Sequence, residues 1–307
     1  MRYFLIITLF IYSFQLFAQK TIRIYHEKDR NDDYVIYCDN KAFCDYIVEI
    51  KFTSLVNLKI NASRPYEKVV HPGINRLFKL EKMRDNSSVD FSYSTSYRKG
   101  NIKPKIKDDI IYLLPVAKGK ETSITLLDYL GSRFKEKEPK NWYALSFKMN
   151  QGDTVFACRR GRVVSKEEGA DPQQKNLAFA REDNFIEVFH EDGTFGRYMV
   201  FEQDQIFVDP GDYFNAGDPL GIVGGENYAS GYHVRFMTYY SFEEPVVQDG
   251  KQIDRKHYWA YLPLNFCTKN HSSQMLLPYK KYVSAHPEHI IVQEMSKREI
   301  KHWKKGK

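Results

Sequence analysis

Between residues 143 and 236 the chain is a succession of short apolar segments that end repeatedly at glycines, and this pattern limits its fold more than any other feature. Segments of this length are typical of β-strands, and glycine supplies the positive φ angles or close chain approaches that strand connections need. A Gly-Asp-x-(Val or Phe)-x-Ala unit begins at Gly152 and again at Gly211. The pattern predicts a domain built from antiparallel strands.

The region from residue 20 to residue 111 shows a second β pattern, in which apolar and polar side chains alternate. Apolar or aromatic residues recur at every second position in two stretches, 46–52 and 89–97. A period of two places these residues on one face of a half-buried strand. Several short strands separated by turn sequences such as His71-Pro72-Gly73 predict a β-sandwich, and we expect an immunoglobulin-like one. The expected fold class is therefore mainly all-β.

The N-terminus has the order of a signal peptide. Arg2 gives a positive start, residues 3–14 are almost wholly apolar, and Ala18 is a small residue at a cleavage point before Gln19. An uncleaved anchor is the alternative, but the apolar stretch is short for a bilayer span. We expect residues 1–18 to be removed and the mature protein to be exported, either to the periplasm or out of the cell.

Export would place the four cysteines in an oxidising compartment. Cys38 and Cys44 are close in sequence and flank a predicted turn, so a small disulfide loop between them is one expectation, although other pairings stay open. Cys158 and Cys267 are interpreted as buried thiols. None of the four has the paired spacing of a structural zinc site.

The formal net charge of +7 is concentrated in the C-terminal tail. Residues 297–307 carry six basic side chains and one acidic side chain, so the remainder of the chain is nearly neutral. Apolar residues at roughly helical spacing predict a basic helix within 287–303. In an exported protein this tail could contact an anionic envelope surface, and a solvated helix end is the alternative. Nucleic-acid binding has no support beyond charge.

The region between residues 143 and 236 also carries motifs in a fixed order and spacing. They are Tyr143-Ala144-Leu145-Ser146-Phe147-Lys148-Met149, Gly152-Asp153-Thr154-Val155-Phe156-Ala157, Gly161-Arg162-Val163-Val164, His190-Glu191-Asp192-Gly193, Tyr198-Met199-Val200-Phe201, Leu220-Gly221-Ile222-Val223-Gly224 and Gly231-Tyr232-His233-Val234-Arg235-Phe236. In this order the region resembles the lysostaphin (LytM-type) family of zinc peptidoglycan endopeptidases over residues 112–268. The resemblance implies a LytM-like antiparallel β domain, which we place at 112–275, followed by a basic tail at 276–307.

The resemblance also implies where the zinc ligands of such an enzyme would stand. In the family, zinc is held by a His, by an Asp a few residues later and by the second His of a closing His-x-His, and two further His residues assist. Here Ser146 stands at the Asp position, Val200 at one assisting position and Arg235 at the last ligand position, while His233 survives at the other assisting position.

The first ligand position falls on Arg133 or Trp142, and no His occurs between Pro72 and Phe189. Zinc needs neutral imidazole or carboxylate donors and an open position for water. A guanidinium stays protonated and has no lone pair to offer. The chain is therefore expected to be a degenerate member that lacks zinc and any other cofactor, and not to be an enzyme.

The remaining function is expected to be binding or regulation in the cell envelope. Degenerate members of the family resemble factors that bind cell-wall amidases, so the resemblance implies an amidase, another envelope protein or peptidoglycan as partner. The residues expected to line the former active-site groove are Arg235, His233, Tyr198, Val200 and Ser146.

Arg235 would present a cation at the groove floor, or it would pair internally with an acid and close the groove. Two alternatives from other classes stay open. One is an active zinc endopeptidase with a displaced ligand set, and the other is a structural or adhesive protein that acts through its β-sandwich.

Overall fold

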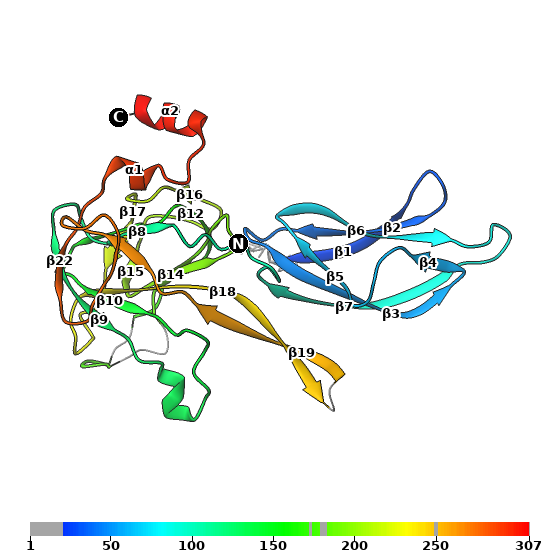
Figure 1. Cartoon of the computed structure of the whole chain (residues 1–307), viewed down its shortest axis with the longest axis horizontal. Coiled ribbons are helices and arrows are strands. Elements are labelled where there is room, and N and C mark those ends of the chain that lie inside the picture. Colours follow the sequence, from blue (N-terminus) through cyan, green and yellow to red (C-terminus); the bar gives the residue numbers. More distant parts are fainter. Residues whose placement is uncertain (1–20, 172–173, 179–182, 249–250, 307) are drawn as a thin grey trace, which may run out of the picture.

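The computed structural model describes residues 21–171, 174–178, 183–248 and 251–306, and β-strands dominate it (Figure 1). The expected all-β fold class is confirmed. Figure 1 shows two β regions, with the N-terminal strands in blue and cyan and the second region in green to orange. Within the described residues, no helix is long and apolar enough to cross a membrane.

The N-terminal region is a sandwich of two antiparallel sheets. One sheet has the order β1-β2-β6-β4, formed by β1 (Ile22–Lys28), β2 (Tyr34–Asn40), β6 (Gly73–Lys82) and β4 (Leu58–Ile60). The other has the order β5-β3-β7, formed by β5 (Tyr66–Val70), β3 (Tyr46–Val56) and β7 (Asp90–Lys99). Their facing sides share one core, to which Ile36 and Leu80 contribute from the first sheet and Val48 and Ile50 from the second. The expected apolar alternation in 46–52 thus fills the space between the sheets.

The second region is organised by one large antiparallel sheet of nine strands. Eight strands follow the order β16-β12-β13-β14-β18-β10-β9-β22, and β19 pairs with the far half of β18. Their bounds are β16 (Tyr213–Phe214), β12 (Gly161–Glu167), β13 (Phe185–Phe189), β14 (Phe195–Met199), β18 (His233–Gln248), β10 (Leu145–Lys148), β9 (Glu121–Leu126), β22 (Lys281–Val283) and β19 (Lys251–Tyr261).

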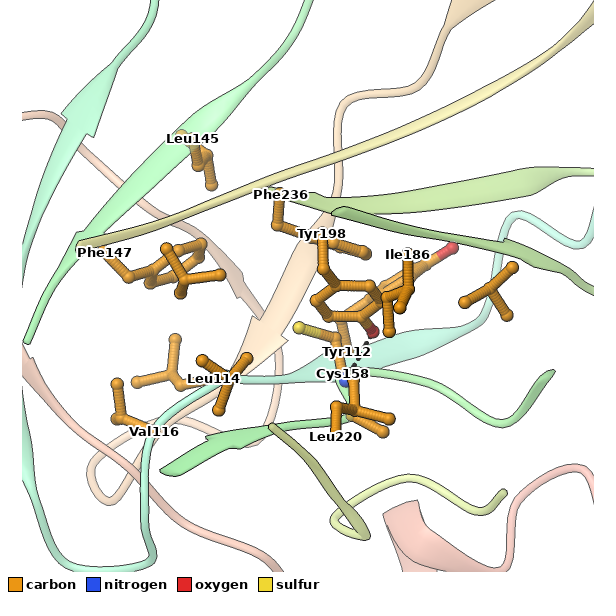
Figure 2. Packing of buried hydrophobic residues seen from close by; sticks show 14 of the residues in the cluster. Tyr112, Leu114, Val116, Leu145, Phe147, Cys158, Ile186, Tyr198, Leu220 and Phe236 are labelled. Atoms are coloured by element: carbon orange, nitrogen blue, oxygen red, sulfur yellow. Dashed lines mark hydrogen bonds between the residues drawn. The ribbon is translucent and has the colours of Figure 1, made fainter. Parts of the chain in front are cut away.

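Two small sheets complete the second region. One contains β11 (Thr154–Phe156), β17 (Pro219–Val223) and β15 (Phe201–Ile206), and the other contains β21 (Gln274–Met275), β20 (Asn265–Cys267) and β8 (Ile111–Leu113). A short 3-10 helix covers Leu130–Phe134. Figure 2 shows the core that these elements share with the large sheet, in which Tyr112, Tyr198 and Phe236 pack together.

The expected short C-terminal helix is confirmed, but it is not continuous over 287–303. The C-terminal segment forms two helices, α1 (Glu288–Ile291) and α2 (Lys297–Lys305). The side chain of Ser296 accepts a hydrogen bond from the Glu299 backbone N–H, and the Glu299 carboxylate accepts one from the Ser296 backbone N–H. This capping box starts a new helix, so the apolar spacing that spans the break does not reflect one continuous helix.

The structure contradicts the expected disulfide between Cys38 and Cys44. All four cysteines of the chain are free thiols and buried. Cys38 lies in the sandwich core, whereas Cys44 packs in a separate cluster with Phe195 and Tyr239 of the second region. The two side chains serve different cores, and sequence proximity alone did not reveal this.

A buried arginine fastens the C-terminal segment to the second region. Arg159 is only 1% exposed and donates hydrogen bonds to both carboxylate oxygens of Glu294, at 2.9 and 2.7 Å. Its guanidinium also lies 3.0 Å from the carboxylate of Asp192 and donates to the Tyr112 hydroxyl at 3.1 Å. Glu294 stands between α1 and α2, so this pairing ties the start of the tail to the core.

Alternating charges join the sandwich to the second region. Arg98 of β7 pairs with Glu67 of β5 and with Glu243 of β18. Arg255 of β19 pairs with the same two carboxylates, at 3.2 Å from Glu67 and 3.6 Å from Glu243. Two cations and two anions therefore hold the β18–β19 hairpin against the sandwich.

Candidate functional site

The residues singled out from the sequence meet on three neighbouring strands of the large sheet, β14, β18 and β10. Arg235 of β18 stands opposite Ser146 of β10 and opposite Met199 of β14. Residues that are directly opposite share a face of the sheet. Ser146 and Arg235 therefore lie side by side on one face, and both are 9% exposed.

The Arg235 guanidinium is held by its own domain. Its Nε donates a hydrogen bond to Nε2 of His233 at 3.2 Å, and its Nη2 donates to the carbonyl oxygen of Ala178 at 3.4 Å. Its Nη1 lies 3.8 Å from a carboxylate oxygen of Asp183, and the Tyr228 ring lies under the guanidinium at 4.8 Å. The Tyr228 hydroxyl in turn donates to Asp183. Of the two expectations for Arg235, the structure has the internal pairing.

His233 uses both of its ring nitrogens within this network. Nδ1 lies 2.6 Å from the carbonyl oxygen of Gly231, so Nδ1 carries the proton and donates it. Nε2 then carries the lone pair, which accepts the hydrogen bond from Arg235. Burial lowers the pKa of His233 to about 4, with the nearby Arg235 cation acting in the same direction. The imidazole is therefore neutral and has no free lone pair.

Val200 lies at the corner between β14 and β15. Its φ of 73° is in the left-handed region, which β-branched residues rarely adopt, and its backbone N–H donates to the carbonyl oxygen of Asn184. The side chain is buried and aliphatic. This position consequently has no group that can exchange a proton.

Tyr198 is not a groove residue, which corrects the expectation from the sequence. It stands opposite Phe236 rather than Arg235, so its ring enters the core on the other face of the sheet (Figure 2). Its hydroxyl accepts a hydrogen bond from the Cys158 backbone N–H at 2.8 Å. The positive φ of Val200 breaks the two-residue alternation, so Tyr198 and Val200 need not share a face.

Sequence reasoning missed Asp183 and Tyr228, the partners of Arg235. They come from the loop before β13 and the loop before β18, and no local pattern links them to Arg235. Burial raises the pKa of Asp183, although the hydrogen bond from Tyr228 and the charge of Arg235 act against this rise. A cleft of about 180 Å³ lies beside these two residues, and Val200, Glu202, Glu226 and Tyr232 also line it.

With this geometry established, comparison with known proteins identifies the second region. Residues 140–254 match the model of Peptidase family M23. This part of the chain is an M23 domain. The expected resemblance to the lysostaphin (LytM) family is confirmed for these residues. The comparison with curated proteins gives no match.

Three solved structures illustrate the similarity. The catalytic domain of lysostaphin from Staphylococcus simulans is 25% identical, over 41% of this chain and 80% of that chain, with a TM-score of 0.27. A chain of the SpoIIQ–SpoIIIAH pore-forming complex is 24% identical, over 42% of this chain and 83% of that chain, with a TM-score of 0.29. Csd3 of Helicobacter pylori is 13% identical, over 94% of this chain and 79% of that chain, with a TM-score of 0.29.

The side chains of this M23 domain do not fit the zinc ion that the family implies. Ser146 offers a neutral hydroxyl, Arg235 offers no lone pair, and the lone pair of His233 is already bound to Arg235. In the described ranges, no group of three or more His, Cys, Asp or Glu side chains is arranged to hold a metal ion. No catalytic step through zinc can be derived from these residues.

The turn motif at His190 has a structural role. His190 is buried, and its Nδ1 lies 2.7 Å from the carbonyl oxygen of Arg160. Asp192 accepts hydrogen bonds from the backbone and hydroxyl of Thr194 and pairs with Arg159. The motif therefore shapes a turn and completes the Arg159 cluster, away from Arg235.

Proposed function

We propose that this chain is a non-hydrolytic M23-fold protein of the bacterial cell envelope that works by binding. Its partner would be a cell-wall amidase or another envelope protein, or peptidoglycan itself. We further propose that residues 1–18 direct export and are removed, so that the protein acts in the periplasm or outside the cell.

One observation carries this proposal, which is the hydrogen bond from Nε of Arg235 to the Nε2 lone pair of His233. In a zinc hydrolase the corresponding donors hold a metal that lowers the pKa of bound water. Here a permanent cation takes the imidazole lone pair and lies over the Tyr228 ring. The pocket therefore supplies positive charge where a cation would have to be bound, and the geometry favours a role that needs no metal.

The same contacts change where binding should occur. Arg235 is largely covered and engaged by Asp183 and Ala178, so it is not an open anchor at the groove floor. The partner surface would instead include the adjoining cleft, which Asp183 and Glu226 line with carboxylates. An acidic cleft favours a cationic group on the partner.

The test combines metal content with two activity measurements on the chain from Gln19 onward. After equilibration with zinc and removal of the excess, we expect well under about one equivalent per chain, because a single-site zinc protein retains one. We also expect no cleavage of peptidoglycan or oligoglycine peptides, and stimulation of a cell-wall amidase when the protein is added. Zinc at full stoichiometry that disappears in His233→Ala, together with cleavage activity, would falsify the proposal and favour a displaced ligand set.

A further inference from the structure

A separate cleft lies between the sandwich and the M23 domain, and it has a volume of about 240 Å³. Phe43 and Pro72 line it from the sandwich, and Phe189 and Tyr213 line it from the second region. Apolar side chains thus form walls on both sides. One guanidinium, that of Arg162 on β12, lies between two of these walls.

Arg162 is fixed in place by contacts that leave its outer edge available. Its Nε donates a hydrogen bond to the carbonyl oxygen of Gly211 at 3.1 Å. The guanidinium carbon lies 4.6 Å from the centre of the Phe43 ring and 5.0 Å from that of Tyr213, so it is held between two aromatic rings. Within the described part of the chain, no hydrogen bond or ion pair engages its two terminal nitrogens.

The backbone beneath Arg162 is shaped to admit Phe43. Gly211 has a φ of 106°, and a Cβ atom at this position would meet the Phe43 ring at 3.0 Å. Glycine at 211 therefore allows the sandwich to bring an aromatic ring over the guanidinium. A larger residue would push Phe43 away and open the cleft.

The other charges that line this cleft differ from Arg162 because most of them already have close partners. Asp45 pairs with His71 at 2.7 Å, Arg160 pairs with Glu299 at 2.5 Å, and Glu294 pairs with Arg159. Glu191 is exposed to solvent. Arg162 is thus the lining cation whose two terminal nitrogens have no hydrogen-bond or ion-pair partner among the described residues, while its Nε is bound to Gly211.

We propose that this cleft binds the C-terminal carboxylate of a peptide whose last side chain is apolar. The terminal nitrogens of Arg162 would donate two parallel hydrogen bonds to the carboxylate, the arrangement for which a guanidinium is suited. The apolar side chain would pack against Phe43, Pro72 and Tyr213. The end of a peptide needs only one path out of a cleft between two domains. An internal acidic residue needs room for the peptide chain on both of its sides.

This inference is independent of the proposed loss of hydrolysis, because Arg162 takes no part in the Arg235 network. The probe is N-acetyl-leucine, and its matched control is N-acetyl-leucinamide, which has the same shape without the charge. Titration of the ¹⁵N-labelled mature chain would follow the arginine side-chain Nε–H resonances and the neighbouring backbone amides by NMR. We expect saturable shifts at Arg162, Gly211 and Tyr213 with the acid and none with the amide.

Three variants make the test specific. Arg162→Gln is expected to weaken binding of N-acetyl-leucine at least about tenfold, because a bidentate charged pair is lost. Tyr213→Ala removes one aromatic wall at a position that is 66% exposed, so folding should survive, and binding should weaken about two- to fivefold. Arg84→Gln, in the exposed loop between β6 and β7, is the matched control and should bind like the unaltered chain.

Equal shifts with the acid and the amide would overturn the proposal. So would unchanged affinity in Arg162→Gln, or the absence of saturable binding by the folded chain at roughly 50 mM ligand, a concentration well above the millimolar range of weak specific binding. Shifts that map to the Asp183 cleft instead of Arg162 would also overturn it.

Discussion

Two buried arginines of the second region, Arg159 and Arg235, are paired in different ways. Arg159 donates to both oxygens of Glu294 and lies within 3.0 Å of Asp192. Arg235 reaches its carboxylate, Asp183, only at 3.8 Å and spends its other nitrogens on uncharged acceptors. A buried charge is well stabilised only by close and well-oriented partners. Arg159 is therefore a structural clamp, meaning a buried cation closely paired with Glu294 and Asp192, whereas Arg235 at the zinc-ligand position of the family is held less tightly.

The largest effect that follows from this comparison is expected at the clamp. Arg159→Ala would leave Glu294 and Asp192 buried without their cation, and breaking a buried pair in this way costs about 3–5 kcal/mol. Urea unfolding of the mature chain measures the loss. Arg298→Ala, at an exposed position of α2, is the control and should change the free energy of unfolding by less than about 0.5 kcal/mol. A loss below about 1 kcal/mol for Arg159→Ala would remove the distinction between the two arginines.

The next effect, which is smaller for each residue, concerns pH, because one buried histidine accompanies each arginine. Burial lowers the pKa of His190 to about 4, with Arg159 adding to the fall, and the pKa of His233 is also about 4. The unfolded chain binds protons below about pH 6.5, whereas the folded chain does not until about pH 4. Stability is therefore full above about pH 6.5 and falls as the pH decreases toward 4, by about 3 kcal/mol for each histidine.

Chemical denaturation at a series of pH values measures this slope. His190→Gln and His233→Gln should each flatten it, since glutamine does not titrate, and the double variant should flatten it most. His289→Gln, on the exposed side of α1, is the control. A slope between pH 6.5 and 4 that survives both substitutions would assign the effect to other groups.

The smallest effect is expected at Arg235 itself. Arg235→Met keeps much of the side-chain volume and removes a loosely held charge, and burial already raises the pKa of Asp183, the carboxyl group nearest to that charge. We expect a loss of only about 1 kcal/mol in the free energy of unfolding, because the contact that is lost is long, at 3.8 Å, and Asp183 keeps the hydrogen bond that the Tyr228 hydroxyl donates to it. The same urea experiment measures it. A cost as large as that of Arg159→Ala would mean that both arginines are clamps.

The local patterns of the sequence predicted the fold well. The alternation around Val48 and Ile50 placed both residues in the sandwich core, and the glycine-broken segments between 143 and 236 became strands. The alternation and the glycine spacing are local patterns that extend over only a few residues, so they can be recognised in a single sequence. The predicted C-terminal helix is present, but the capping box at Ser296 and Glu299 starts it at Lys297, so the apolar spacing before that point belongs to a separate helix.

The site was predicted less completely. The family motif located Ser146, His233 and Arg235, and the structure brings these three together. It could not supply Asp183, because that contact joins separate loops and depends on the packed structure. The predictions of Tyr198 as a groove residue and of a disulfide between Cys38 and Cys44 were wrong for a related reason. Residues that are close in sequence point their side chains into different parts of the structure.

Strand β18 has a mechanical consequence. It begins at His233 and extends through Gln248, a contour of roughly 50 Å at the usual rise per residue. Its distal half carries Glu243, which pairs with Arg98 of the sandwich, and its first residue carries the imidazole that accepts a hydrogen bond from Arg235. A displacement of the sandwich relative to the second region would therefore act on the same strand that carries this pocket.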